Sequence, residues 1–187
     1  MEDRRTFIKK VSCLTGACLC GFTSLVQTAT AAETSNVPMP NPNESLMQDW
    51  ISNLLLSIDQ TADKETHRTI LKACAVSHYQ QLKMDEFLSP YIGKIEAFSQ
   101  FLEKEWGWKV QFQKDSGKII ADENKKACVC PMVNKAKGVR SSILCYCSEG
   151  FAELMFSKVA GHPVKAEVLQ SIHRGAATCV YQIDLKS

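Results

Sequence analysis

Several features that would direct a functional assignment are missing from this 187-residue chain. Its charges nearly balance, with 22 Lys and Arg against 20 Asp and Glu, so no basic excess points to a nucleic acid. No Ser-His-Asp order, phosphate-binding loop or pair of catalytic carboxylates stands out. The apolar stretch at residues 11–26 is diluted by serine, threonine and glycine, which makes it too short and too weak for a span of about 20 apolar residues. A stable membrane span and nucleic-acid binding are therefore not expected.

The N-terminus has the features of an export signal. Residues 4–10 read RRTFIKK, an apolar stretch follows, and residues 29–31 read ATA, a small-residue cleavage pattern. We therefore predict that residues 1–31 are a signal peptide. The twin-arginine translocation machinery, which moves folded proteins, would export the chain to the periplasm or another extracytoplasmic space. A lipid-attachment site at Cys18, which lacks the usual leucine three residues before it, and an uncleaved anchor are the alternatives.

The remaining chain has the length of one ordinary domain behind a tether. Removal of residues 1–31 takes away four of the 22 basic and two of the 20 acidic side chains, which leaves 18 of each. Residues 32–44 contain three prolines and almost no apolar side chains, which predicts an extended tether. Residues 45–187 are predicted to form a single domain.

The hydrophobic period predicts an α+β fold for this domain. Apolar residues recur every three or four positions in residues 45–106, with Ser45 as a candidate N-cap and a break expected near Pro90. His67 and Arg68 lie on a helix face that we expect to be solvated. Residues 107–187 contain a hairpin, a helix and a second hairpin, which indicates an antiparallel sheet. The expected elements are helices at about 45–58, 63–82, 84–106 and 141–160, and strands at 108–112, 118–122, 164–172 and 177–185.

Two cysteine couplets, Cys128 with Cys130 and Cys145 with Cys147, are the strongest chemical signal. Four thiolates from two segments match the ligand preferences of zinc, copper(I) and iron–sulfur clusters. Familiar sites space their paired cysteines by two residues rather than one, which weakens the signal. If a helix already runs at residue 143, Cys145 and Cys147 lie about 200° apart around it. Both reach one ion only if the helix starts near Ser148.

Cys74 and His78 lie four residues apart on one predicted helix face and have the spacing of metal ligands. A buried thiol beside a satisfied histidine explains the same spacing. His173 is expected at a solvent-facing hairpin turn, and Cys179 in the core. Because the predicted compartment is oxidising, disulfides among the six cysteines left after cleavage are a further explanation.

Part of the second half resembles a known family. The resemblance rests on the runs CYCSEGF at 145–151, GHPV at 161–164, SIHRG at 171–175 and CVYQI at 179–183. Over residues 106–185 they look like the small-molecule-binding domain related to the 4-vinyl reductases of chlorophyll synthesis, whose relatives include a thiazoline carboxylate hydrolase group. The resemblance implies a cup in which helices cover an antiparallel sheet and hold a hydrophobic small molecule. Its exported, cysteine-rich form would be a departure from that family.

Three functional hypotheses follow. The first is an exported protein that binds zinc, copper or an iron–sulfur cluster through the couplets, with a small-molecule pocket beside them, in redox chemistry or metal handling. The second is a metal-free small-molecule-binding module with disulfides. The third is a hydrolase or reductase with a cysteine nucleophile, which needs a thiol pKa lowered by a cation such as Arg140 or His173. The sequence does not decide whether the protein is an enzyme.

Overall fold

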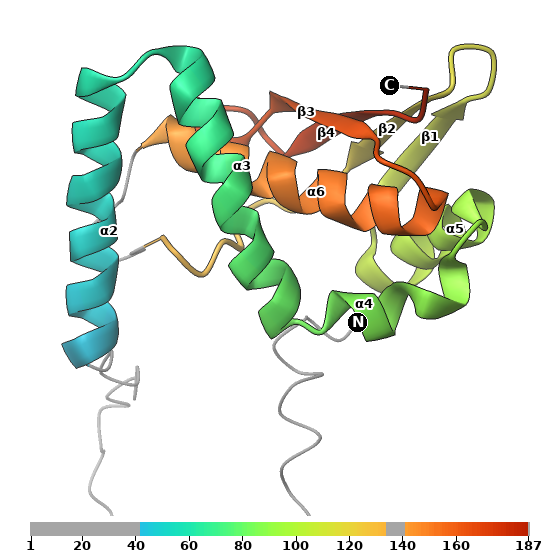
Figure 1. Ribbon diagram of the computed structural model, residues 1–187, viewed down its shortest axis with the longest axis horizontal. Coiled ribbons are helices and arrows are strands. Elements are labelled where there is room, and N and C mark those ends of the chain that lie inside the picture. The colour runs from blue at the N-terminus through green and yellow to red at the C-terminus, as the bar shows by residue number, and fades with distance from the viewer. Residues whose placement is uncertain (1–41, 134–140, 187) are drawn as a thin grey trace, which may run out of the picture. The chain divides into compact units, whose positions relative to one another are not determined.

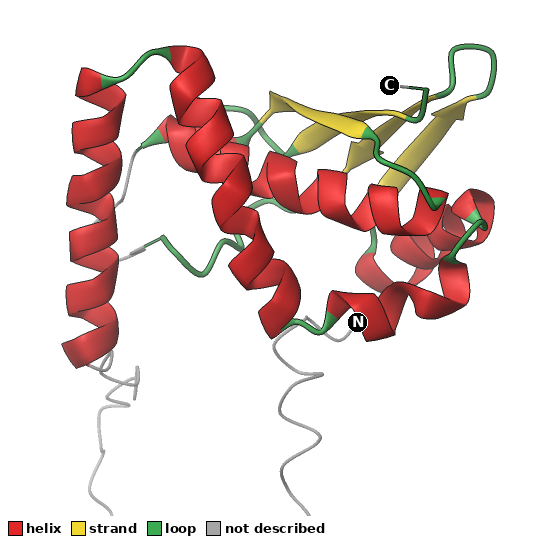
Figure 2. Cartoon of the chain, viewed as in Figure 1, coloured by secondary structure: helices red, strands yellow, loops and turns green. Residues whose placement is uncertain are grey.

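The computed structural model describes residues 42–133 and 141–186. At the centre of this part of the chain, a four-stranded sheet packs against the helix Cys145–Ala160. The predicted signal peptide and the tether up to residue 41 lie outside the described residues. The described elements are α2 (Pro42–Thr61), α3 (Lys64–Gln81), α4 (Met84–Leu88), η1 (Ser89–Tyr91), α5 (Ile95–Trp106), β1 (Lys109–Gln113), β2 (Lys118–Asp122), η2 (Ser142–Leu144), α6 (Cys145–Ala160), β3 (Lys165–Gln170), η3 (Ile172–Arg174) and β4 (Val180–Asp184) (Figure 1). The predicted α+β class is confirmed (Figure 2).

The strands lie in the order β1-β2-β4-β3, and each neighbouring pair is antiparallel. Alternation of side chains gives the sheet one buried face. On the two central strands the register pairs Ile119 with Ile183 and Ala121 with Tyr181, so four buried side chains meet across the strands. Helix α6 packs on β3 and β4. This buried face and the apolar side of α6 form the centre of the core.

Several element boundaries differ from the sequence prediction. Helix α2 begins at Pro42, three residues before the expected N-cap Ser45, which is consistent with the tolerance of proline in the first helical turn. The expected helix at 84–106 is divided into α4, η1 and α5, with Pro90 inside η1, so the predicted break is confirmed. The last hairpin is joined by η3 and by Gly175 at φ 87° instead of a simple turn. No helix among the described residues is long and apolar enough to cross a bilayer.

Helices α3 and α6 approach each other closely at Gly150. A Cβ atom on this glycine would lie 2.6 Å from the carbonyl oxygen and 2.7 Å from the Cα of Lys72. Real Cβ atoms do not come so near backbone atoms, so only glycine permits this crossing. The close approach brings the first turns of α6 against the middle of α3.

A buried ion pair joins the same two helices to the sheet. The Glu149 carboxylate on α6 is fully buried and accepts hydrogen bonds from Arg68 Nε at 2.6 Å and from the Val168 backbone N–H of β3 at 2.9 Å. The expectation that His67 and Arg68 lie on a solvated face is wrong. His67 is buried, with Nε2 3.0 Å from the carbonyl oxygen of Ile58, and Arg68 is the partner of Glu149.

Candidate functional site

Five of the six described cysteines gather around the start of α6. Cys128 and Cys130 lie between β2 and η2, Cys145 and Cys147 in the first turn of α6, and Cys179 just before β4. Negative charge on one of these thiols acts on the others: Cys128, Cys145 and Cys147 each raise the pKa of Cys130. The two predicted couplets therefore lie within electrostatic reach of each other.

His173, which was expected at a solvent-facing turn and was not among the predicted metal ligands, lies beside the thiols. It lies in η3, is half-buried, and its Nε2 is 3.3 Å from Cys128 Sγ. Burial lowers the pKa of His173, which favours the neutral form of its imidazole. In a tetrahedral site with metal–sulfur and metal–nitrogen bonds of about 2.3 and 2.1 Å, these two atoms would be about 3.6 Å apart. The pair is thus close to the separation of two ligands of one ion.

Cys145 and Cys179 lie within electrostatic reach of Cys128. Burial raises the pKa of Cys145, and its thiol donates a hydrogen bond to Ser171 Oγ at 3.1 Å. The pKa of Cys179 is raised to about 11, mainly by burial, with smaller contributions from negative charge on Glu123, Cys145 and Cys128. The expectation that Cys179 is a core residue is met only in part, because its side chain is half-buried.

Cys147 faces away from Cys145. The helix begins at Cys145 and follows η2 directly, so the two side chains leave the axis about 200° apart. In this arrangement Cys145 and Cys147 do not easily bind the same ion. Burial raises the pKa of Cys147 to about 11, and the charged neighbour with the next largest effect is Cys74 on α3.

The second predicted pair, Cys74 and His78, is divided between two environments. Cys74 is exposed, so the expectation of a buried thiol at this position is wrong. The His78 ring stacks on Phe151 with 4.7 Å between ring centroids. Cys74 therefore belongs with Cys147 at the contact of α3 and α6, while His78 packs against an aromatic side chain.

The described parts of the chain contain no group of three or more His, Cys, Asp or Glu side chains arranged to hold a metal ion. All six cysteines there are free thiols rather than disulfides. Burial raises the pKa of four of these thiols, Cys130, Cys145, Cys147 and Cys179, which disfavours the thiolate form that a cysteine nucleophile needs. The largest of these shifts raises the pKa of Cys130 to about 12. Arg174 lowers the pKa of Cys145 by less than burial raises it, and Arg140 lies outside the described residues.

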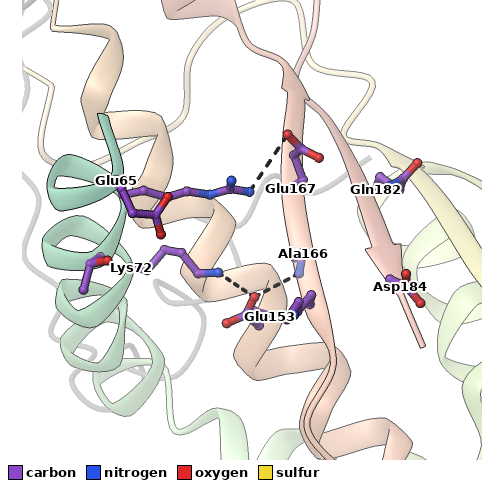
Figure 3. A pocket seen from close by; sticks show the side chains of 10 residues that line it. Glu65, Lys72, Glu153, Ala166, Glu167, Gln182 and Asp184 are labelled. Carbon is purple, nitrogen blue, oxygen red and sulfur yellow. Dashed lines mark hydrogen bonds and ion pairs between the residues drawn. The ribbon is translucent and has the colours of Figure 1, made fainter. Parts of the chain in front are cut away.

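A polar cavity of about 580 Å³ lies apart from these cysteines, between α3, α6, β3 and β4. Figure 3 shows that charged side chains from both helices and both strands surround it. Lys72 Nζ lies 2.6 Å from Glu153 Oε2, and an Arg68 guanidinium nitrogen lies 4.0 Å from Glu167 Oε1. Most of the residues that line the cavity therefore carry a charge. Its lining residues are Glu65, Arg68, Thr69, Lys72, Glu153, Lys165, Ala166, Glu167, Gln182 and Asp184.

Comparison with known proteins gives a family and a fold. The model of a family of unknown function, DUF6144, matches residues 23–187. No curated protein matches the sequence. Among solved structures, a trafficking protein particle complex subunit 3 from Naegleria fowleri, crystallised covalently bound to palmitic acid, is similar with a TM-score of 0.52 and 16% identity. The similarity covers 77% of this chain and 95% of that one, and at this identity it is evidence of a shared fold alone.

Proposed function

We propose that this protein, which belongs to the family of unknown function DUF6144, binds zinc or copper(I) through Cys128, His173, Cys145 and Cys179. The observation that carries the proposal is the 3.3 Å contact between Cys128 Sγ and His173 Nε2 beside two further thiols. Thiolate sulfur and imidazole nitrogen are preferred ligands of these metals. The set retains Cys128 and Cys145 from the sequence prediction. His173 on η3 and Cys179 after it take the places of Cys130 and Cys147.

Helix geometry favours this set over the four couplet cysteines. Cys145 and Cys147 leave the start of α6 about 200° apart, and Cys128 and Cys145 both act electrostatically on Cys179. Cys130 lies within electrostatic reach of Cys128 and Cys145. The alternative is an iron–sulfur cluster bound by all four couplet cysteines, which requires the first turn of α6 to unwind.

Metal binding in this site requires movement, because the ligands are not yet arranged around one point. Cys145 has to give up its hydrogen bond to Ser171 Oγ, and the thiols have to lose their protons. A bound cation provides the positive charge that makes this loss favourable, so binding releases protons and depends on pH. Fixing a rotamer-rich side chain costs up to about 2 kcal/mol, which several metal–ligand bonds offset.

We also propose that the metal site functions in redox chemistry or metal handling outside the cytoplasm. The support for this is the twin-arginine pattern at residues 4–10. That route exports proteins after they fold, so the metal could be inserted before export. Thiols that hold a metal are protected from the disulfide formation that an oxidising compartment otherwise favours.

A second candidate function is binding of a polar small molecule, and the cavity between α3 and β3 favours it. Acidic and basic side chains line this cavity together, which fits a zwitterionic or charged ligand. The palmitic acid bound to the Naegleria protein would not fit this lining, because an acyl chain would desolvate the charges without pairing them. The hydrophobic ligand implied by the family resemblance would meet the same difficulty.

Metal titration of single variants tests the ligand assignment. The full chain, reduced and freed of metal, is titrated with zinc in competition with a chromophoric chelator. We expect Cys128→Ser and His173→Ala each to weaken binding by at least about tenfold, in the range seen for altered metal sites. Cys74→Ser is the matched control and should bind as the wild type does. Equal zinc affinity in all four proteins would contradict the assignment. Loss of affinity in Cys128→Ser, Cys130→Ser and Cys147→Ser, with unchanged affinity in His173→Ala, would favour the couplet site.

A further inference from the structure

Helix α2 carries large apolar side chains that no described part of the protein covers. Leu46, Met47 and Trp50 are 68%, 63% and 63% exposed, and Leu54 is 42% exposed. Isolated exposed apolar residues are common on protein surfaces, but a contiguous group that includes a tryptophan marks an interaction site. These four residues are called the α2 stripe.

The α2 stripe is a continuous part of one helix surface. At about 100° per residue, its members lie beside the inward side, where Leu55 is buried and Ile51 and Ile58 pack against the core. Met47, Trp50 and Leu54 are separated by three and four residues, which is the spacing of a helix-pairing seam. The apolar surface of α2 is thus about twice as wide as the part that the domain covers.

The charges on α2 avoid this stripe. The helix has three acidic residues, Glu44, Asp49 and Asp59, and no lysine or arginine. Each of the three lies about 100° or more from the middle of the stripe on the helical wheel. An acidic helix does not favour an anionic lipid surface, whereas two copies of the uncharged stripe can meet without bringing these carboxylates face to face.

We propose that α2 is a dimer interface, in which the α2 stripe of one copy packs against the same stripe of a second copy about a twofold axis. Such isologous contacts are the commonest form of protein oligomer. The exposed parts of the stripe amount to on the order of 500 Å² per copy, against about 800 Å² for a standard interface. Neighbouring polar rim residues would supply the remainder. Trp and Met are also enriched at interface centres.

Sedimentation equilibrium of the full chain, with light scattering on a sizing column, tests this proposal. We expect the wild type to have twice the chain mass at micromolar concentration. Trp50→Glu should raise the dimer dissociation constant by on the order of several hundredfold, because a hot-spot residue enters a twofold interface twice. Ile70→Glu is the matched control: this α3 residue is 41% exposed and lies outside the stripe, so the variant should remain dimeric.

Three results would overturn the proposal. They are a wild type that is monomeric at 100-fold higher concentration, a Trp50→Glu variant that dimerises as well as Ile70→Glu, and a monomeric wild type that binds phosphatidylcholine vesicles through α2. Circular dichroism melting of each variant shows whether it is folded. If Trp50→Glu fails to fold, Met47→Glu replaces it, because that side chain is equally exposed. Cys128→Ser should dimerise normally, since the stripe contains no residue of the thiol cluster.

Discussion

Replacement of Glu149 by alanine should be among the most damaging single changes in this domain. The carboxylate is fully buried, lies 2.6 Å from Arg68 Nε and 3.7 Å from Lys72 Nζ, and accepts the Val168 N–H at 2.9 Å. Alanine leaves that backbone donor unsatisfied, which costs about 1–3 kcal/mol. It also leaves the Arg68 charge without its buried partner. Removal of one member of a buried pair typically costs about 3–5 kcal/mol.

This loss is a large part of the about 5–15 kcal/mol that stabilises an ordinary domain. Urea unfolding followed by circular dichroism should therefore show a free energy of unfolding lower by about 3–5 kcal/mol. Glu149→Gln, which keeps an acceptor for Val168, should lose less. The control is Glu96→Ala, because Glu96 and its partner Lys114 are 66% and 73% exposed and such pairs contribute about 0–1 kcal/mol. A Glu149→Ala protein within 1 kcal/mol of Glu96→Ala would refute the reasoning.

Three further predictions concern the helix crossing and the thiols. Gly150→Ala should lower the free energy of unfolding by at least about 1–3 kcal/mol, and more than Gly161→Ala does in the same urea experiment, because only the first places a Cβ against backbone. In the reduced, metal-free protein, the free energy of unfolding should fall as the pH rises above 9, because burial holds the pKa of Cys130 near 12 and the unfolded state ionises its thiols first. Cys130→Ala should flatten this decline between pH 8 and 10. An unchanged slope in the variant would contradict the prediction. Iodoacetamide at pH 8 with mass spectrometry should modify exposed Cys74 well before Cys130, and the reverse order would show that the two environments are misassigned.

Local pattern was sufficient for most of the fold. The alternation around Val110 predicted the first hairpin, and Pro90 predicted the division between α4 and α5, because these signals depend only on neighbouring residues. Arg68 was assigned to a solvated face because nothing nearby in the sequence reveals Glu149, its partner 81 residues later. A pair so far apart in the sequence produces no hydrophobic period from which it could be predicted.

The candidate site was predicted in part for the same reason. Cysteine spacing identified the couplets, and the conflict between Cys145 and Cys147 could be worked out from helix geometry. The position of His173 could not, because the sequence reads as an ordinary turn while the chain forms η3 and turns the imidazole toward Cys128.

The measurement that tests the central claim most directly is the metal content of the full chain purified without oxygen and without chelator, with its absorbance spectrum. We predict about one zinc or copper ion per chain in the wild type and in Cys74→Ser, and almost none in Cys128→Ser. Iron and sulfide in equal amounts, with visible absorbance, would move the site to the couplets. A folded wild-type protein that contains no metal and takes up neither zinc nor copper(I) when reduced would contradict the account.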